Sequence, residues 1–160
     1  MGVAVVAVAG VSGLGSALAS SPEPDGLAVV VRSEGGEVLA EVPVPGHRFA
    51  VSYRNSIYQS LAESRYRALP SGRFRLVQIA ADQRAVIEEY YAIPGPTRAL
   101  NADRRTWVTP PERPMTFSEL TIAATDLGER TLHVPGHAPV RLWRLVEENP
   151  IVVLDLERTS

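Results

Sequence analysis

The sequence of 160 residues contains neither cysteine nor lysine. Without cysteine the chain has no disulfide, no thiolate metal site and no thiol nucleophile. Without lysine it has no Schiff-base amine and no P-loop lysine, so all 16 basic side chains are arginine. These two absences exclude several classes of enzyme before any motif is considered.

The chain also lacks a strong charge of either sign, since its formal net charge is −2 at pH 7. Nucleic-acid binding selects for a basic surface, so no nucleic-acid partner is expected. A composition of 45% hydrophobic and 21% charged residues excludes collagen-like, coiled-coil and wholly disordered chains. The length fits one domain with a sizeable core.

No side chain is charged before Glu23. The apolar stretch from Val3 to Leu14 has the length of a signal-peptide core, and Ala17-Leu18-Ala19 is the small-x-small pattern that signal peptidase cleaves. We therefore predict a signal peptide or membrane anchor at residues 1–19, a short linker at 20–26 and a single β domain at 27–160. The domain is then exported or membrane-anchored, lies outside the cytoplasm, and contacts the membrane only through its N-terminal segment.

Two other interpretations of this segment compete with export. An apolar run of this kind also suits a buried strand. The glycines at 10, 13 and 15 are similar to a dinucleotide-binding turn, but their spacing is G-x-x-G-x-G, and prolines at 22 and 24 leave no room for the helix that such a site needs. No cofactor is therefore expected.

After residue 26, short apolar runs alternate with turn residues at intervals of roughly 8–12 residues, which is typical of sandwiches and barrels. The expected strands cover residues 27–32, 37–44, 48–53, 65–69, 73–79, 117–123, 130–134, 140–145 and 151–156. The sequence predicts an all-β, mainly antiparallel fold. It is expected to be a β-sandwich or partly open barrel with at most one or two short helices.

Three segments depart from this strand pattern. Ser56 to Ala68 places apolar and small residues at helix spacing, and Asp82 to Tyr91 holds several good helix formers. Ile93 to Pro114 contains five of the 13 prolines and has no clear period, which predicts a long loop. Loops of that length in a compact domain are usually functional or disordered.

No residue pattern identifies a catalytic or metal site. His133 and His137 are four residues apart, but Pro135-Gly136 between them excludes the helix that would aim both rings at one metal ion. No G-x-S-x-G elbow occurs, so no serine is recognisable as a nucleophile. We predict no catalytic residue and no metal ligand.

The arginines are concentrated in one part of the chain. From Arg48 to Arg84 there are seven arginines and only two acids, Glu63 and Asp82, with tyrosines between them. Guanidinium groups bind carboxylates and phosphates in a bidentate geometry, so this region predicts a face suited to a small anion. The alternative is that the arginine stems cover the sheet while their charged heads reach water.

The stretch from Phe49 to Glu63 reads F-A-V-S-Y-R-N-S-I-Y-Q-S-L-A-E and resembles the opening signature of the DUF1850 family. Tyr53, Ser56 and Glu63 match that signature, and Asn55 stands where the family usually has histidine. Asparagine does not titrate but donates and accepts hydrogen bonds, which suits ligand binding or a buried polar network.

The acidic-aromatic stretch from Glu88 to Tyr91 and the C-terminal R-L-W-R-L…I-V-V-L-D-L extend the resemblance over residues 27–157. The family comprises small bacterial and archaeal proteins of unknown function, often encoded beside TRAP transporters of the TAXI type. The resemblance implies a non-enzymatic accessory domain that works with subunits of such a transporter.

We expect this domain to bind a small anionic ligand or a partner through a polar cluster at strand ends. The residues of this predicted cluster are Tyr53, Arg54, Asn55, Ser56, Glu63 and Glu89. The alternative is an enzyme of unknown class with a polar site around Ser56, Glu63 and Glu89.

Overall fold

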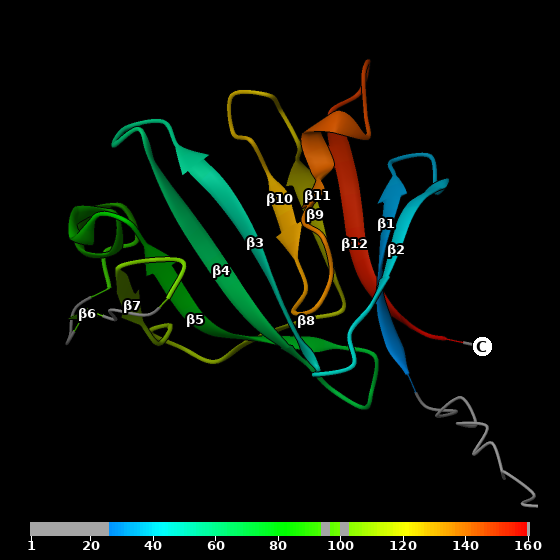
Figure 1. Cartoon of the computed structure of the whole chain (residues 1–160), viewed down its shortest axis with the longest axis horizontal. Helices are drawn as coiled ribbons and strands as arrows, with labels where there is room; N and C mark the ends of the chain where they lie inside the picture. The colour runs from blue at the N-terminus through cyan, green and yellow to red at the C-terminus, as the bar shows by residue number, and fades with distance from the viewer. Residues whose placement is uncertain (1–25, 94–96, 100–102, 160) are drawn as a thin grey trace, which may run out of the picture.

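The computed structural model of the chain describes residues 26–93, 97–99 and 103–159. The predicted signal peptide or anchor at 1–19 lies outside the described residues, as does nearly all of the linker. Within the described ranges the strands form two antiparallel sheets that do not close into a barrel (Figure 1). The prediction of an all-β, antiparallel sandwich is confirmed.

The smaller sheet has four strands in the order β2-β1-β12-β9. Its strands are β1 (Leu27–Ser33), β2 (Val38–Pro43), β9 (Glu119–Ala123) and β12 (Ile151–Arg158). The β-branched run of β1 pairs with β2 on one side and with β12 on the other. The first five residues of β1 are buried, those that face the other sheet and those between them alike.

The larger sheet has the order β11-β10-β3-β4-β5-β7-β6, and β8 also pairs with β5. Its longest strands are β3 (Arg48–Asn55), β4 (Ser60–Ala68) and β5 (Phe74–Ala81). The short strands are β6 (Arg98–Ala99), β7 (Trp107–Thr109), β8 (Met115–Phe117), β10 (Thr131–His133) and β11 (Val140–Arg141). A π-helical turn, η1 (Val86–Tyr90), follows β5, and a 3-10 turn, η2 (Leu142–Arg144), follows β11.

The core lies between the two sheets. Phe49, Tyr66 and Phe74 project into it from β3, β4 and β5, with ring centroids 5.1 to 5.5 Å apart. Val29 and Leu154 meet them from the smaller sheet. Because side chains alternate along a strand, the residues between these core positions lie on the opposite face of the larger sheet, which we call its outer face.

The register of β3 and β4 decides which polar residues share the outer face. Ser52 lies opposite Glu63, and the next pair, Tyr53 and Ala62, faces the core. On the neighbouring strand β10, His133 lies opposite Ala50 and therefore also belongs to the outer face. One face of the β3–β4 hairpin therefore packs in the core, and its other face carries polar side chains.

The helical interpretation of residues 56–68 is wrong. Ser60–Ala68 forms β4, because its residues at even positions from Ala62 to Tyr66 face the core while Glu63 and Arg65 face outward. The segment 82–91 is helical in part, because Arg84 and Ala85 are α-helical and continue as the π-helical turn η1.

Two further expectations needed correction. The predicted loop at 93–114 contains β6 and β7, which extend the larger sheet beside β5. The strand expected at 140–145 stops at Arg141 and continues as η2. No helix within the described residues is long and apolar enough to cross a membrane.

Candidate functional site

The outer face of the larger sheet holds a carboxylate that is fully shielded from solvent. Glu63 has no exposed surface, and its Oε1 accepts hydrogen bonds from Nε of Arg65 and Nη2 of Arg104, both at 2.7 Å. The Nε atom of Arg105 lies 3.8 Å from Oε2 of Glu63. Three guanidinium groups therefore surround one carboxylate on the strand.

Burial alone would raise the pKa of Glu63, but the hydrogen bonds from Arg104 and Arg65 outweigh it and hold that pKa below its ordinary value. Glu63 is therefore ionised at neutral pH. A buried, ionised and multiply hydrogen-bonded carboxylate organises the arginines around it and is not available as a general acid.

A second group of contacts fastens the segment from Asp103 to Arg105 over the sheet. The guanidinium of Arg65 donates to both carboxylate oxygens of Asp103 and, at 2.7 Å, to Oε1 of Gln78. The hydrogen bond from Arg65 lowers the pKa of Asp103. Arg105 in turn donates to Asp82 at 3.2 Å. Charge pairing thus places three arginines from two distant parts of the chain on one face.

His133 lies beside this charge cluster. Its Nε2 is 2.8 Å from Oγ of Ser52, so a hydrogen bond joins β10 to β3 through side chains as well as through the backbone. Burial, followed by the charges of Arg104 and Arg105, lowers the pKa of His133. The imidazole is therefore neutral at pH 7.

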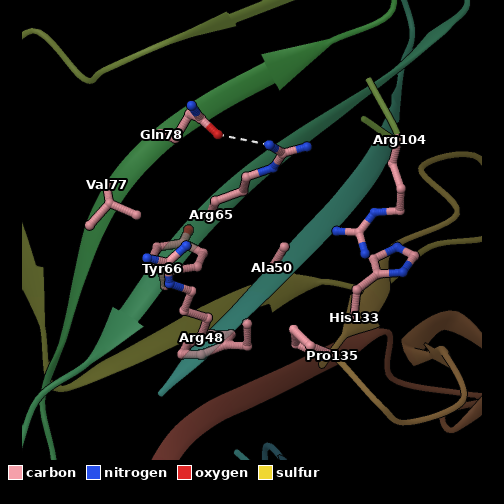
Figure 2. Close-up of a pocket in the computed structure, with 10 residues that line it drawn as sticks. Arg48, Ala50, Arg65, Tyr66, Val77, Gln78, Arg104, His133 and Pro135 are labelled. Carbon is pink, nitrogen blue, oxygen red and sulfur yellow. Dashed lines mark hydrogen bonds between the residues drawn. The ribbon is translucent and has the colours of Figure 1, made fainter. Parts of the chain in front are cut away.

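A hollow of about 190 Å³ opens on one side of His133 (Figure 2). Arg48, Arg65 and Arg104 line it together with Gln78 and His133, and Arg104 and His133 lie close together at one end of it. No carboxylate among the described residues lines this hollow. The guanidinium of Arg48 has no hydrogen bond or ion pair with any residue that the structure describes. The hollow is therefore electropositive.

A second hollow of about 430 Å³ lies on the other side of His133. Arg105, Arg141 and Arg144 line it, and Arg144 lies 4.7 Å from the ring centroid of Trp143. Glu129, the one carboxylate among the described residues that line it, accepts from Nε of Arg54 at 3.0 Å. Positive charge thus exceeds negative charge on both sides of the histidine.

The structure separates the six residues of the predicted cluster. Tyr53 faces the core and donates to the hydroxyl of Tyr91 at 2.7 Å. Asn55 is buried at the end of β3, where its Oδ1 accepts from the amides of Ile57 and Tyr58 at 3.0 and 3.1 Å. Asn55 therefore builds the turn between β3 and β4.

The other four lie at different places. Arg54 pairs with Glu129 at the rim of the second hollow. Ser56 is exposed in the turn, and Glu89 accepts from the hydroxyl of Tyr58 at 2.6 Å. Of the six, only Glu63 is in direct contact with the arginines that line the hollows.

Sequence reasoning did not identify Arg104 or His133 as site residues. Arg104 belongs to the proline-rich segment 93–114, which the sequence predicted to be a long loop of the kind that is usually functional or disordered. His133 was considered only as a metal ligand or a turn residue. The register that places it beside Ser52 depends on long-range strand pairing and leaves no local signal.

Within the described ranges, no group of three or more histidine, aspartate or glutamate side chains is arranged to hold a metal ion. No family model, no curated protein and no solved structure matches this chain. The resemblance to the DUF1850 family therefore stays a prediction.

Proposed function

We propose that this domain binds a small anion, a carboxylate or a phosphate, on the outer face of its larger sheet beside His133. The observation that supports this proposal is the first hollow, which three arginines line and no carboxylate does. Arg65 and Arg104 are already held in place by Glu63, so their orientation is fixed before an anion arrives.

Arg48 is the group that such an anion would neutralise. Arg65 and Arg104 each share charge with an acid, whereas Arg48 has no acidic partner among the described residues. A planar guanidinium binds two oxygens of one carboxylate or phosphate side by side. Gln78 and His133 add neutral polar groups to the same wall.

Calorimetric titration with inorganic phosphate and with succinate tests this proposal. We expect Arg48→Gln to weaken binding by about tenfold, because a charge-assisted hydrogen bond contributes on the order of 1.5–3 kcal/mol. Arg73→Gln is the matched control, since Arg73 is exposed and does not line the hollow. The proposal fails if neither anion binds, or if both variants bind as the wild type does.

We also propose that the domain works outside the cytoplasm as an accessory to a TRAP-type transporter. The support is the resemblance of residues 27–157 to the DUF1850 family and the export pattern at 1–19. Mass spectrometry of the N-terminus tests cleavage after Ala19. Solute uptake by cells that carry the wild-type or Arg48→Gln gene tests whether transport depends on the anion site.

A second candidate function is an enzyme. The sequence pointed to Ser56, Glu63 and Glu89 for this role, and the hydrogen bond between Ser52 and His133 favours Ser52 as the nucleophile instead. An activated serine attacks the phosphorus of a fluorophosphonate probe: the Oγ–P bond forms, the P–F bond of the probe breaks and releases fluoride, and the Oγ proton passes to the histidine. Labelling of the wild type that is absent in Ser52→Ala would support an enzyme, and absence of labelling would exclude this dyad.

A further inference from the structure

Arg130 places a positive charge between the two sheets. It directly precedes β10, and its guanidinium carbon lies 4.3 Å from the ring centroid of Tyr53, a core residue that is only 6% exposed. The guanidinium of Arg130 has no hydrogen bond or ion pair with any residue in the described parts of the chain. The neighbouring acid, Glu129, is already paired with Arg54.

Arg130 is half-buried, and a charge that is even partly withdrawn from water is usually paired or hydrogen-bonded. The contact with the ring of Tyr53 replaces only part of the hydration that the Arg130 guanidinium loses. A cation–π contact uses the flat face of the guanidinium and leaves the N–H groups at its edge free to donate.

The surrounding phenols do not neutralise Arg130. Burial raises the pKa values of Tyr53, Tyr66 and Tyr91 above the ordinary value of 10, although the charge of Arg130 lowers those of Tyr66 and Tyr91 slightly. All three phenols are therefore uncharged at neutral pH. The site offers polar groups and one cation but no anion.

A slot of about 200 Å³ adjoins this arginine. Val51, Ser64 and Tyr66 form its wall on the larger sheet, and Leu120 and Ile122 of β9 form the opposite wall. β9 pairs with β12 on one side only, so no described strand closes the sandwich along its other edge. The slot therefore combines apolar walls with a free cation.

We propose that the slot between β9 and the larger sheet binds a small carboxylate with an apolar chain. The carboxylate accepts from the free N–H groups of Arg130, and the chain lies against Val51, Leu120 and Ile122. This site is separate from the outer-face hollow, because Arg130 and Arg48 lie on opposite faces of the larger sheet. A phosphate without an apolar part gains nothing from these walls, so the slot selects the amphipathic ligand.

Thermal unfolding and calorimetry with octanoate test this inference, with octanamide as the neutral probe of the same length. We expect octanoate to bind the wild type and octanamide to bind at least about tenfold more weakly, because only the carboxylate pairs with Arg130. Arg130→Gln should lose octanoate binding, and Arg130→Lys, which keeps the charge, should retain part of it.

Two controls keep this test separate from that of the outer-face anion site. Both probes are titrated in saturating phosphate, which fills the outer-face site, so that only the slot is left to bind octanoate. Under these conditions the wild type and Arg48→Gln should bind octanoate equally. The inference is overturned if octanoate does not bind the wild type, if octanamide binds equally well, or if Arg48→Gln abolishes octanoate binding. The comparison of octanoate with octanamide in saturating phosphate uses the unaltered protein, so it decides the matter even if Arg130→Gln does not fold.

Discussion

Nη2 of Arg104 lies 2.7 Å from Oε1 of Glu63, although the two residues are 41 positions apart in the chain. This contact joins the centre of β4 to the segment that leads into β7. Glu63 is fully buried and also accepts a hydrogen bond from Arg65. Its carboxylate therefore holds Arg65 and Arg104 against the outer face of the sheet.

Glu63→Gln should therefore destabilise the domain. The substitution leaves Arg104 and Arg105 without their buried counter-charge, and loss of hydrogen bonds to a charged group costs about 2–3 kcal/mol. The free energy of unfolding in urea measures this loss. Glu112→Gln is the matched control, since Glu112 is exposed and should change stability by no more than about 0.5 kcal/mol. Equal stabilities for both variants would contradict the role assigned to Glu63.

The acid stability of the domain should depend on the same carboxylate. The pKa values of Glu63 and Asp103 are lowered in the folded state, so each group stabilises the fold above its unfolded-state pKa and loses that effect as the pH falls through the lower folded value. We expect the free energy of unfolding to decrease between about pH 5 and pH 2. Glu63→Gln should flatten this dependence, and a curve parallel to that of the wild type would refute the assignment.

His133 should titrate below its ordinary value of 6.5, because burial and the charges of Arg104 and Arg105 disfavour the imidazolium. A histidine with a lowered folded pKa stabilises the fold fully above pH 6.5 and loses that contribution as the pH falls below it. NMR titration of the imidazole C–H signals measures this pKa directly. In Arg104→Gln the pKa of His133 should rise, and an unchanged value would show that Arg104 does not act on it.

Bound phosphate should reverse this shift. An anion in the first hollow adds negative charge beside His133 and favours the protonated ring, so its pKa should increase when phosphate is present. The same NMR titration repeated in phosphate and in chloride at equal ionic strength measures the difference. Arg48→Gln should show a smaller increase than Arg73→Gln, whose arginine is remote from the hollow.

The local pattern was sufficient to predict the class of fold. Val29 to Val31 and Phe49 to Tyr53 are short β-branched or alternating runs, and such runs predict strands wherever they occur. The pattern failed at Ser60–Ala68, where small residues also satisfy a helix period. Pairing with β3 on one side and β5 on the other makes that segment a strand.

The site was harder to predict than the fold. The concentration of arginine after Arg48 predicted an anion-binding face, and Glu63, one of the predicted site residues, contacts three arginines on the outer face. The partners of Glu63 were not predictable, because Arg104 reaches it through tertiary packing of a segment without periodicity. Tyr53 and Asn55 are adjacent to Arg54 in sequence, but strand alternation and the turn direct their side chains elsewhere.

Asn55 and Ser56 provide a last test, because they are adjacent residues with opposite expected effects. Asn55→Ala removes the acceptor for the amides of Ile57 and Tyr58 and should destabilise the domain by about 1–2 kcal/mol, as loss of a capping side chain does elsewhere. Ser56→Ala should change stability by no more than about 0.5 kcal/mol, because Ser56 is exposed. Urea unfolding measures both, and phosphate titration should give wild-type affinity for both. If Asn55→Ala binds phosphate more weakly at temperatures where it remains folded, Asn55 contributes to anion binding, as the sequence predicted.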